Sequence, residues 1–110
     1  MAIIRISDEN MDKVTRYNLM KGNGADSLKN AAGSVLEVGA FIINELDEEN
    51  LKLSLVTLDG EMFVSTSQTC IKDFIDIADC WDNVLPPIEF LTATSKKGRE
   101  YLTCRPAQMK

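Results

Sequence analysis

The chain of 110 residues contains no histidine. This removes the side chain that most often serves as a general base and as a metal ligand. Its three cysteines, Cys70, Cys80 and Cys104, are an odd number without CxxC spacing, which is typical of free thiols in a reducing compartment. The sequence also lacks a P-loop and a GxGxxG loop. It therefore predicts neither an enzyme nor a bound cofactor or metal.

Long apolar runs are also lacking. No run approaches the roughly 18 to 20 residues of a membrane span, and the opening MAIIRISDEN has no signal-peptide core. We therefore expect a cytoplasmic protein without a membrane partner. The apolar content of 45% and the length suit a single globular domain with one modest core.

Basic residues are scarce in the middle of the chain and dense near the C-terminus. The net charge is −5, but residues 37–94 carry −10 and residues 95–110 carry +4. Exposed charges are screened beyond about 10 Å at ordinary salt, so charge acts locally. The basic end can therefore bind a polyanion on a protein that is acidic overall.

From residue 34 onward, the pattern predicts a mainly β domain with one helix. Strands are predicted at 34–45, 51–58, 61–67, 88–94 and 99–105, and a helix at 67–84. Gly39 marks a bend in the first strand, and Asp59-Gly60 marks a hairpin. The order β-β-β-α-β-β predicts a five-stranded OB-like barrel over 34–106, whose first strand bends to pair in both sheets. The alternative is another small α+β or open-sheet fold.

Residues 1–33 are predicted to form an N-terminal helical arm packed on this domain. A short strand is expected at 2–6, a short helix within 7–24 and one helical turn within 25–33. We find no linker or repeat, so arm and barrel count as one domain.

The helix at 67–84 has an apolar stripe formed by Ile71, Phe74, Ile75, Ala78 and Trp81. We therefore assign Trp81 to the core and not to base stacking. The opposite side carries Asp73, Asp76, Asp79 and Asp82. This spacing resembles ligands for two metal ions, but a solvated helix face is the favoured interpretation. The acidic run at 45–49 is likewise interpreted as a solvated turn.

The last strand alternates between apolar and polar residues. Leu102 and Cys104 share one face. The other face carries Arg99, Tyr101, Thr103 and Arg105. Arginine interleaved with an aromatic ring suits single-stranded nucleic acid, because guanidinium meets phosphate and the ring stacks on a base. Lys96 and Lys97 extend this positive track. The alternative is a solvated edge hairpin that basic residues protect from aggregation.

Further candidates for nucleic-acid contact lie on other predicted elements. They are Lys52 and Phe63 on the second and third strands, and Arg16, Tyr17 and Lys21 in the arm. Phe63 and Phe41 are also typical of core residues, and the arm residues are typical of the solvated face of a helix.

Residues 58–77, 86–90 and 94–104 resemble small single-stranded-DNA-binding (helix-destabilising) proteins of bacteriophages and of mobile elements of Gram-positive bacteria. The resemblance implies an OB-type fold and a sequence-nonspecific coat on single-stranded DNA during replication or recombination. It also implies replication proteins as partners, and it places Lys96, Lys97, Arg99 and Tyr101 on the strand-binding hairpin. Self-association on DNA is expected from the charge pattern, because the acidic middle and the basic end give each copy two faces of opposite sign that can pair head to tail. Many such proteins end in an acidic tail, whereas this chain ends in the basic RPAQMK.

Two other functions remain open. One is an acidic interaction or inhibitor module that imitates DNA, which residues 37–94 would support by their charge. The other is a phage structural β-barrel protein, for which the sequence has no specific feature.

Overall fold

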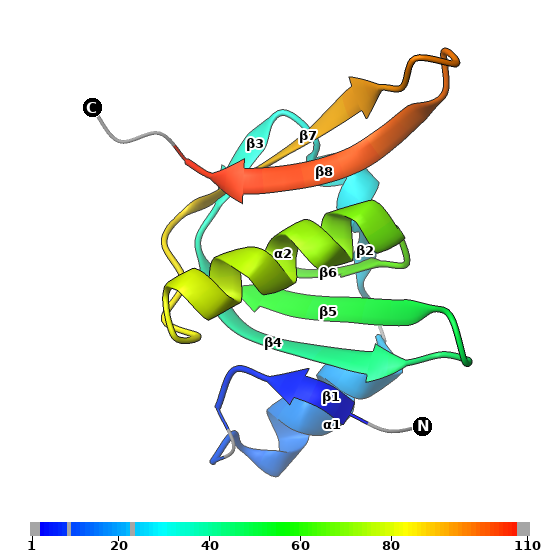
Figure 1. Ribbon diagram of the computed structural model, residues 1–110. Coiled ribbons are helices and arrows are strands. Elements are labelled where there is room, and N and C mark those ends of the chain that lie inside the picture. Colours follow the sequence, from blue (N-terminus) through cyan, green and yellow to red (C-terminus); the bar gives the residue numbers. More distant parts are fainter. Residues whose placement is uncertain (1–2, 9, 23, 108–110) are drawn as a thin grey trace.

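The computed structural model describes residues 3–8, 10–22 and 24–107 of the chain. Its elements in chain order are β1 (Ile3–Ile6), α1 (Lys13–Lys21), β2 (Asp26–Ser27), the 3-10 turn η1 (Leu28–Ala31), β3 (Ser34–Leu36), β4 (Val38–Glu45), β5 (Leu51–Thr57), β6 (Met62–Ser65), α2 (Gln68–Cys80), β7 (Ile88–Thr94) and β8 (Glu100–Pro106). Figure 1 shows their arrangement. The predicted mainly β class is confirmed. No helix in these ranges has the length and apolar character needed to cross a membrane.

The strands form two sheets that share one bent segment. The larger sheet has the order β1-β4-β5-β6-β2, and the smaller has the order β3-β7-β8. The predicted long strand at 34–45 is divided, because β3 pairs with β7 while β4 pairs with β5 and β1. The β4–β5 register shifts between Val38 and Ala40, which flank Gly39. The bend predicted at this glycine is confirmed.

The described strands do not close into a barrel. No pairing joins β6 to β8 within these residues, so the predicted five-stranded OB-like barrel is not confirmed. Instead β2 runs parallel to β6, with Asp26 opposite Phe63 and Ser27 opposite Val64. The turn η1 follows, and its Leu28 is fully buried. The segment before β3 therefore supplies core residues beside the opening.

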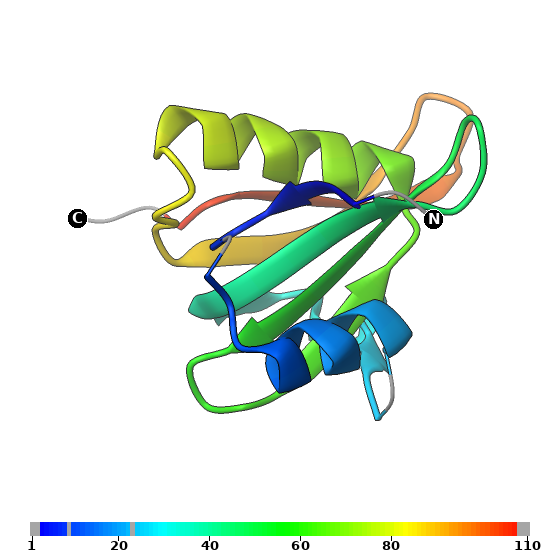
Figure 2. The same ribbon diagram turned by 90° about the horizontal axis from the view of Figure 1, so that it is seen from below.

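The two α-helices lie on opposite faces of the larger sheet (Figure 2). Helix α1 is capped by Asp12, whose carboxylate accepts a hydrogen bond from the Thr15 amide at 3.2 Å. It packs on β4 and β5, and its Leu19 is fully buried. Helix α2 is capped by Ser67 and packs against β8 and β5. The main core therefore lies on the α2 side of the sheet.

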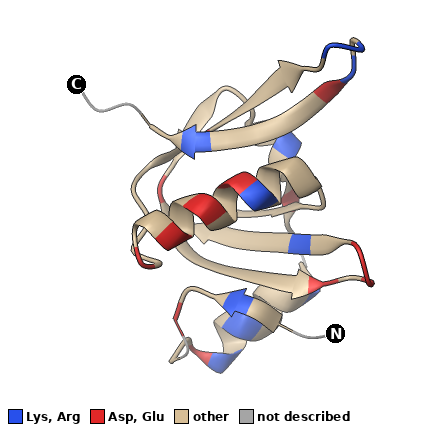
Figure 3. Cartoon of the chain, in the orientation of Figure 1, with Lys and Arg blue, Asp and Glu red and all other residues tan. Residues whose placement is uncertain are grey.

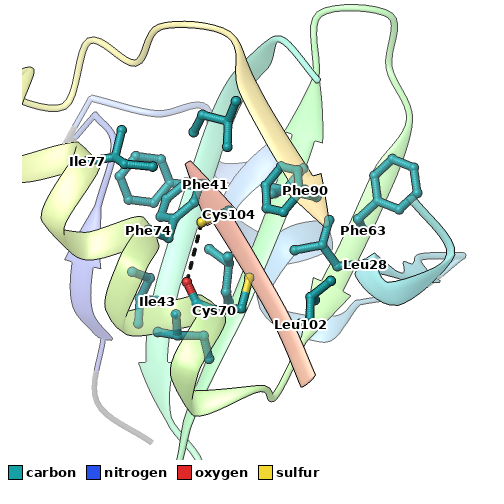
Figure 4. Packing of buried hydrophobic residues seen from close by; sticks show 14 of the residues in the cluster. Leu28, Phe41, Ile43, Phe63, Cys70, Phe74, Ile77, Phe90, Leu102 and Cys104 are labelled. Carbon is teal, nitrogen blue, oxygen red and sulfur yellow. Dashed lines mark hydrogen bonds between the residues drawn. The ribbon is translucent and has the colours of Figure 1, made fainter. Parts of the chain in front are cut away.

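Aromatic and aliphatic side chains from both sheets fill this core (Figure 4). The rings of Phe41 and Phe74 meet edge to face, with centroids 4.9 Å apart. The Cys104 thiol donates to the Cys70 carbonyl oxygen at 3.6 Å. A side-chain hydrogen bond with Cys70, together with burial, raises the pKa of Cys104. Both thiols are free, as the sequence predicts.

The assignment of Trp81 to the core is wrong. Helix α2 ends at Cys80, and the Trp81 side chain at its C-cap is 43% exposed. Asp82 and Asn83 follow with φ of 52° and 68°, which turns the chain away from the helical path. The buried stripe of α2 contains Ile77, whereas Ile75 is only half-buried. The predicted helix at 67–84 was too long. Trp81 was therefore assigned to the buried stripe of a helix that ends before it.

Candidate functional site

Two neighbouring hollows open beside the unpaired edge of β8. The first, of about 470 Å³, is lined by residues of β2, η1, β5, β6, β7 and β8 and includes Lys29, Lys52 and Tyr101. The second, of about 440 Å³, is lined by Thr69, Ser95, Arg99 and Tyr101. Tyr101 lines both. Tyr101 is therefore the aromatic residue that the two hollows share, and we call the two hollows together the track.

Strand alternation explains the position of Tyr101. It lies opposite Ala93 of β7, and its neighbour Leu102 points into the core. The Tyr101 side chain is 37% exposed. The predicted division of β8 into an apolar face and an aromatic, basic face is therefore confirmed. A half-exposed tyrosine offers a surface on which a planar group can stack.

Two lysines from distant parts of the chain border the first hollow. Lys52 lies on the α1 face of β5, and its Nζ donates to the Met20 carbonyl oxygen at 3.4 Å. Lys29 is exposed on η1, where the Ser27 hydroxyl accepts from the Lys29 amide at 3.3 Å. Sequence reasoning selected Lys52 but missed Lys29. Ser27 is a capping signal, but the place of η1 next to β6 and β7 depends on the parallel β2–β6 pair.

Lys96 and Lys97 occupy the tip of the β7–β8 hairpin, drawn in blue in Figure 3. The turn is closed by Ser95 and Arg99, whose amide and carbonyl groups are 2.8 Å apart, and by Gly98 with φ of 81°. Both lysines are exposed, and neither lines a hollow. They form no ion pair with a carboxylate of the described residues. The tip therefore projects beyond the track.

The other end of β8 is already engaged by neighbouring acids. Arg105 Nε donates to Glu89 Oε1 at 2.8 Å across the β7–β8 pair. The Thr103 hydroxyl donates to the Asp73 carboxylate on α2. On the predicted polar face of β8, Tyr101 is therefore accessible to a ligand, whereas Thr103 and Arg105 already contact Asp73 and Glu89.

The arm candidates lie apart from the hollows. Arg16, Tyr17 and Lys21 belong to α1, and Lys21 Nζ lies 5.9 Å from the centroid of the Tyr17 ring. The Tyr17 side chain is 57% exposed. Neither hollow includes any of the three. The end of α1 contacts the track through the hydrogen bond from Lys52 to the Met20 carbonyl.

Phe63 is corrected as a candidate for base stacking. Its side chain is only 7% exposed and belongs to the core cluster, as does Phe41. Alternation in β6 directs Phe63 inward, and pairing with Leu55 of β5 fixes that face. A ring enclosed in this way cannot receive a base without disrupting the core.

The acidic residues lie on other surfaces. The Asp47 carboxylate accepts hydrogen bonds from the Asn50 side chain and the Glu49 amide, which lower its pKa. The Asp47 carboxylate therefore has hydrogen-bond donors within its own turn. Asp79 on the outer face of α2 pairs with Arg5 of β1. Over the described ranges, no three Cys, Asp or Glu side chains converge to hold a metal ion.

No family profile, curated protein or solved structure matches this chain.

Proposed function

We propose that this protein binds single-stranded nucleic acid, DNA in particular, without strong sequence preference. The observation that carries the proposal is the position of Tyr101 between two hollows, with Lys29 and Lys52 on one side and Arg99 on the other. An aromatic platform flanked by cations suits a flexible strand, because bases of any identity stack and phosphates meet positive charge. A duplex offers no unstacked base to such a platform.

The strand order supports an OB-type architecture for this site. The order β-β-β-α-β-β and the first strand shared between two sheets are features of that fold. We infer an OB-type barrel that is open between β6 and β8, with η1 beside the opening. Lys52 on the second barrel strand and the 95–99 loop between the last two then lie where OB folds bind oligonucleotides.

Low sequence specificity follows from the chemistry of the track. Phosphate contacts give affinity without reading bases, and lysine and arginine are the expected contacts. Stacking on Tyr101 accepts every base, because each base has a π face. A role in coating DNA during phage replication or recombination, in the cytoplasm of a host cell, extends this proposal through the resemblance of 58–77 and 94–104 to helix-destabilising proteins.

Titration of the full chain with oligo(dT) at two salt concentrations tests the proposal. Quenching of tyrosine fluorescence should report binding at Tyr101, and log K should fall with log salt by about 0.7 per phosphate contacted. Oligo(U) of equal length separates DNA from RNA preference, and a duplex of equal length is the control. Absence of binding to either oligonucleotide at low salt would refute the proposal.

The outer face of α2 favours a second candidate, an acidic module that imitates DNA. Asp76 and Asp79 are exposed there, and Asp82 is exposed in the turn that follows, in a segment of high negative charge (Figure 3). Such a module would bind a DNA-handling protein and no oligonucleotide. The same titration therefore distinguishes the two functions.

A further inference from the structure

Two large apolar side chains are exposed together where α2 ends. Trp81 is 43% exposed and Val84 is 77% exposed. Hydrogen bonds hold the turn that carries them, because the Asn83 amide donates to the Ala78 carbonyl at 2.9 Å and Arg5 donates twice to the Asn83 side chain. An exposed tryptophan is a common anchor of a protein interface. We call Trp81, Val84 and the turn between them the helix-end patch.

Acidic side chains lie on α2 and in the turn that follows it. Asp76 and Asp82 are exposed, and neither forms an ion pair with a described cation. Asp79 is different, because its carboxylate pairs with Arg5. An aromatic face beside free carboxylates suits an ammonium or guanidinium group, which is attracted both to the ring and to the acids.

The matching cations are on the same protein but at its other end. Lys96 and Lys97 extend from the β7–β8 hairpin without a carboxylate partner among the described residues. Figures 1 and 2 both show the hairpin tip and the C-terminal end of α2 at opposite ends of the molecule. One chain therefore cannot join its own two surfaces, whereas two copies can.

We propose that the helix-end patch of one copy receives Lys96 and Lys97 of the next copy. One ammonium lies over the Trp81 ring, and the other pairs with Asp76 or Asp82. The contact joins different surfaces of the two copies, so it propagates in a row. Tyr101 and Arg99 remain available to the strand, since the two lysines line neither hollow. The use of this contact in a row on nucleic acid rests on the proposed function.

Charge reversal on each side tests the pairing. K96E/K97E reverses the tip, and D76K/D82N reverses the patch while keeping at position 82 a residue that tolerates positive φ. Exposed ion pairs and cation–π contacts each change affinity by a factor of about 2 to 5. Each variant should therefore lose about tenfold in cooperativity on long poly(dT). The chain carrying all four changes should recover part of it, because the tip and position 76 are again opposite in charge, whereas the contact of an ammonium with the Trp81 ring stays lost.

Binding to a one-site oligo(dT) separates the two proposals. D76K/D82N, whose changes lie outside both hollows, should bind it within about threefold of the wild type, and a matched control, K13E/D59K, should keep both affinity and cooperativity. K96E/K97E changes the 95–99 loop of the proposed strand site, so its cooperativity is taken as the ratio of its affinity on poly(dT) to its own one-site affinity. Full cooperativity in either single-side variant, or no recovery in the combined variant, would overturn the pairing. One-site binding without any cooperativity in the wild type would overturn it as well, while leaving the proposed function intact.

Cross-linking of the unmodified protein gives a result that does not need nucleic-acid binding. A carbodiimide joins a lysine amine to a carboxylate that touches it. In an equal mixture of 14N- and 15N-labelled protein at high concentration, mixed-isotope peptides should link Lys96 or Lys97 to Asp76 or Asp82. Absence of these mixed peptides, both without and with poly(dT), would refute the contact.

Discussion

The hydroxyl of Ser67 donates a hydrogen bond to the main-chain carbonyl oxygen of Leu102 at 3.3 Å. The same oxygen atom of Ser67 accepts from the Cys70 amide and so caps α2. One side chain therefore joins the start of the helix to β8, at the edge where β6 and β8 do not pair. Both residues line the first hollow.

Ser67→Ala should lower the free energy of unfolding by about 1–2 kcal/mol, the upper range for loss of a helix cap. We expect the upper range because the variant also loses the hydrogen bond from Ser67 to Leu102 of β8. Urea unfolding at pH 7 measures the change, and Thr66→Ala is the matched control because Thr66 is exposed next to it in the chain. An unchanged midpoint for Ser67→Ala would show that water replaces both bonds.

Trp81→Ala should cost less than about 1.5 kcal/mol, because nearly half of the side chain is already in water. Phe74→Ala, which empties a fully buried site, should cost about 3–5 kcal/mol. Thermal unfolding of the two variants side by side compares them. Equal losses would mean that Trp81 contributes to the core after all.

Tyr101→Ala should weaken binding to oligo(dT) by about 1–3 kcal/mol, the value of one base stacked on an aromatic ring. Tyr101→Phe should keep most of the affinity, since the ring does the stacking. Tyr17→Ala is the control, because Tyr17 is exposed but lines neither hollow. If all three variants bind like the wild type, Tyr101 is not the platform.

Lys52→Ala combined with Arg99→Ala should reduce the salt dependence of one-site binding. Loss of two phosphate contacts lowers the log–log slope by about 1.4, at about 0.7 for each contact. The effect should be the same for oligonucleotides of different sequence, because phosphates carry no base information. A slope equal to that of the wild type would remove both residues from the strand path.

The stability of the protein should fall as the pH rises above about 9. A side-chain hydrogen bond with Cys70, together with burial, raises the pKa of Cys104 in the folded state above its ordinary value of 9.0. Below that value the thiol is protonated in both states; above it, only the unfolded chain releases the proton, which favours unfolding. Urea midpoints at pH 7 and pH 10 should therefore differ less for Cys104→Ala than for the wild type.

The burial of the thiols can also be tested by chemical modification. Iodoacetamide should modify the exposed Cys80 in the folded protein and leave the buried Cys70 and Cys104 unmodified. Rapid modification of all three thiols under native conditions would contradict the packing of α2 on β8.

The strands could be predicted from the sequence because alternation and turn residues lie within or next to each strand. Residues 88–94 alternate and end at a turn with Gly98, and β7 has these bounds. The same alternation separated Tyr101 from Leu102. Trp81 could not be placed in this way, since the end of α2 depends on the left-handed turn at Asp82 and Asn83 and on Arg5 from β1.

The track was predictable only in part, because some of its residues are brought together by pairing between distant parts of the chain. Tyr101 and Arg99 belong to one hairpin, and their pattern is visible in the sequence. Lys29 joins them through the β2–β6 pairing, which links residues far apart in the chain. Phe63 was ambiguous because both faces of residues 61–67 contain apolar side chains, and only the packing on β5 decides which face is inside.

The segment shared by β3 and β4 also sets when the protein can fold during synthesis. β3 pairs with residues 88–90, more than fifty positions later in the chain. Ile88, Phe90, Leu102 and Cys104 of that last hairpin are core residues. A nascent chain that has emerged only as far as α2 therefore lacks the core residues of β7 and β8 and the strand that pairs with β3. Native packing must then wait until nearly the whole chain has left the ribosome, and such long-range pairing also slows folding.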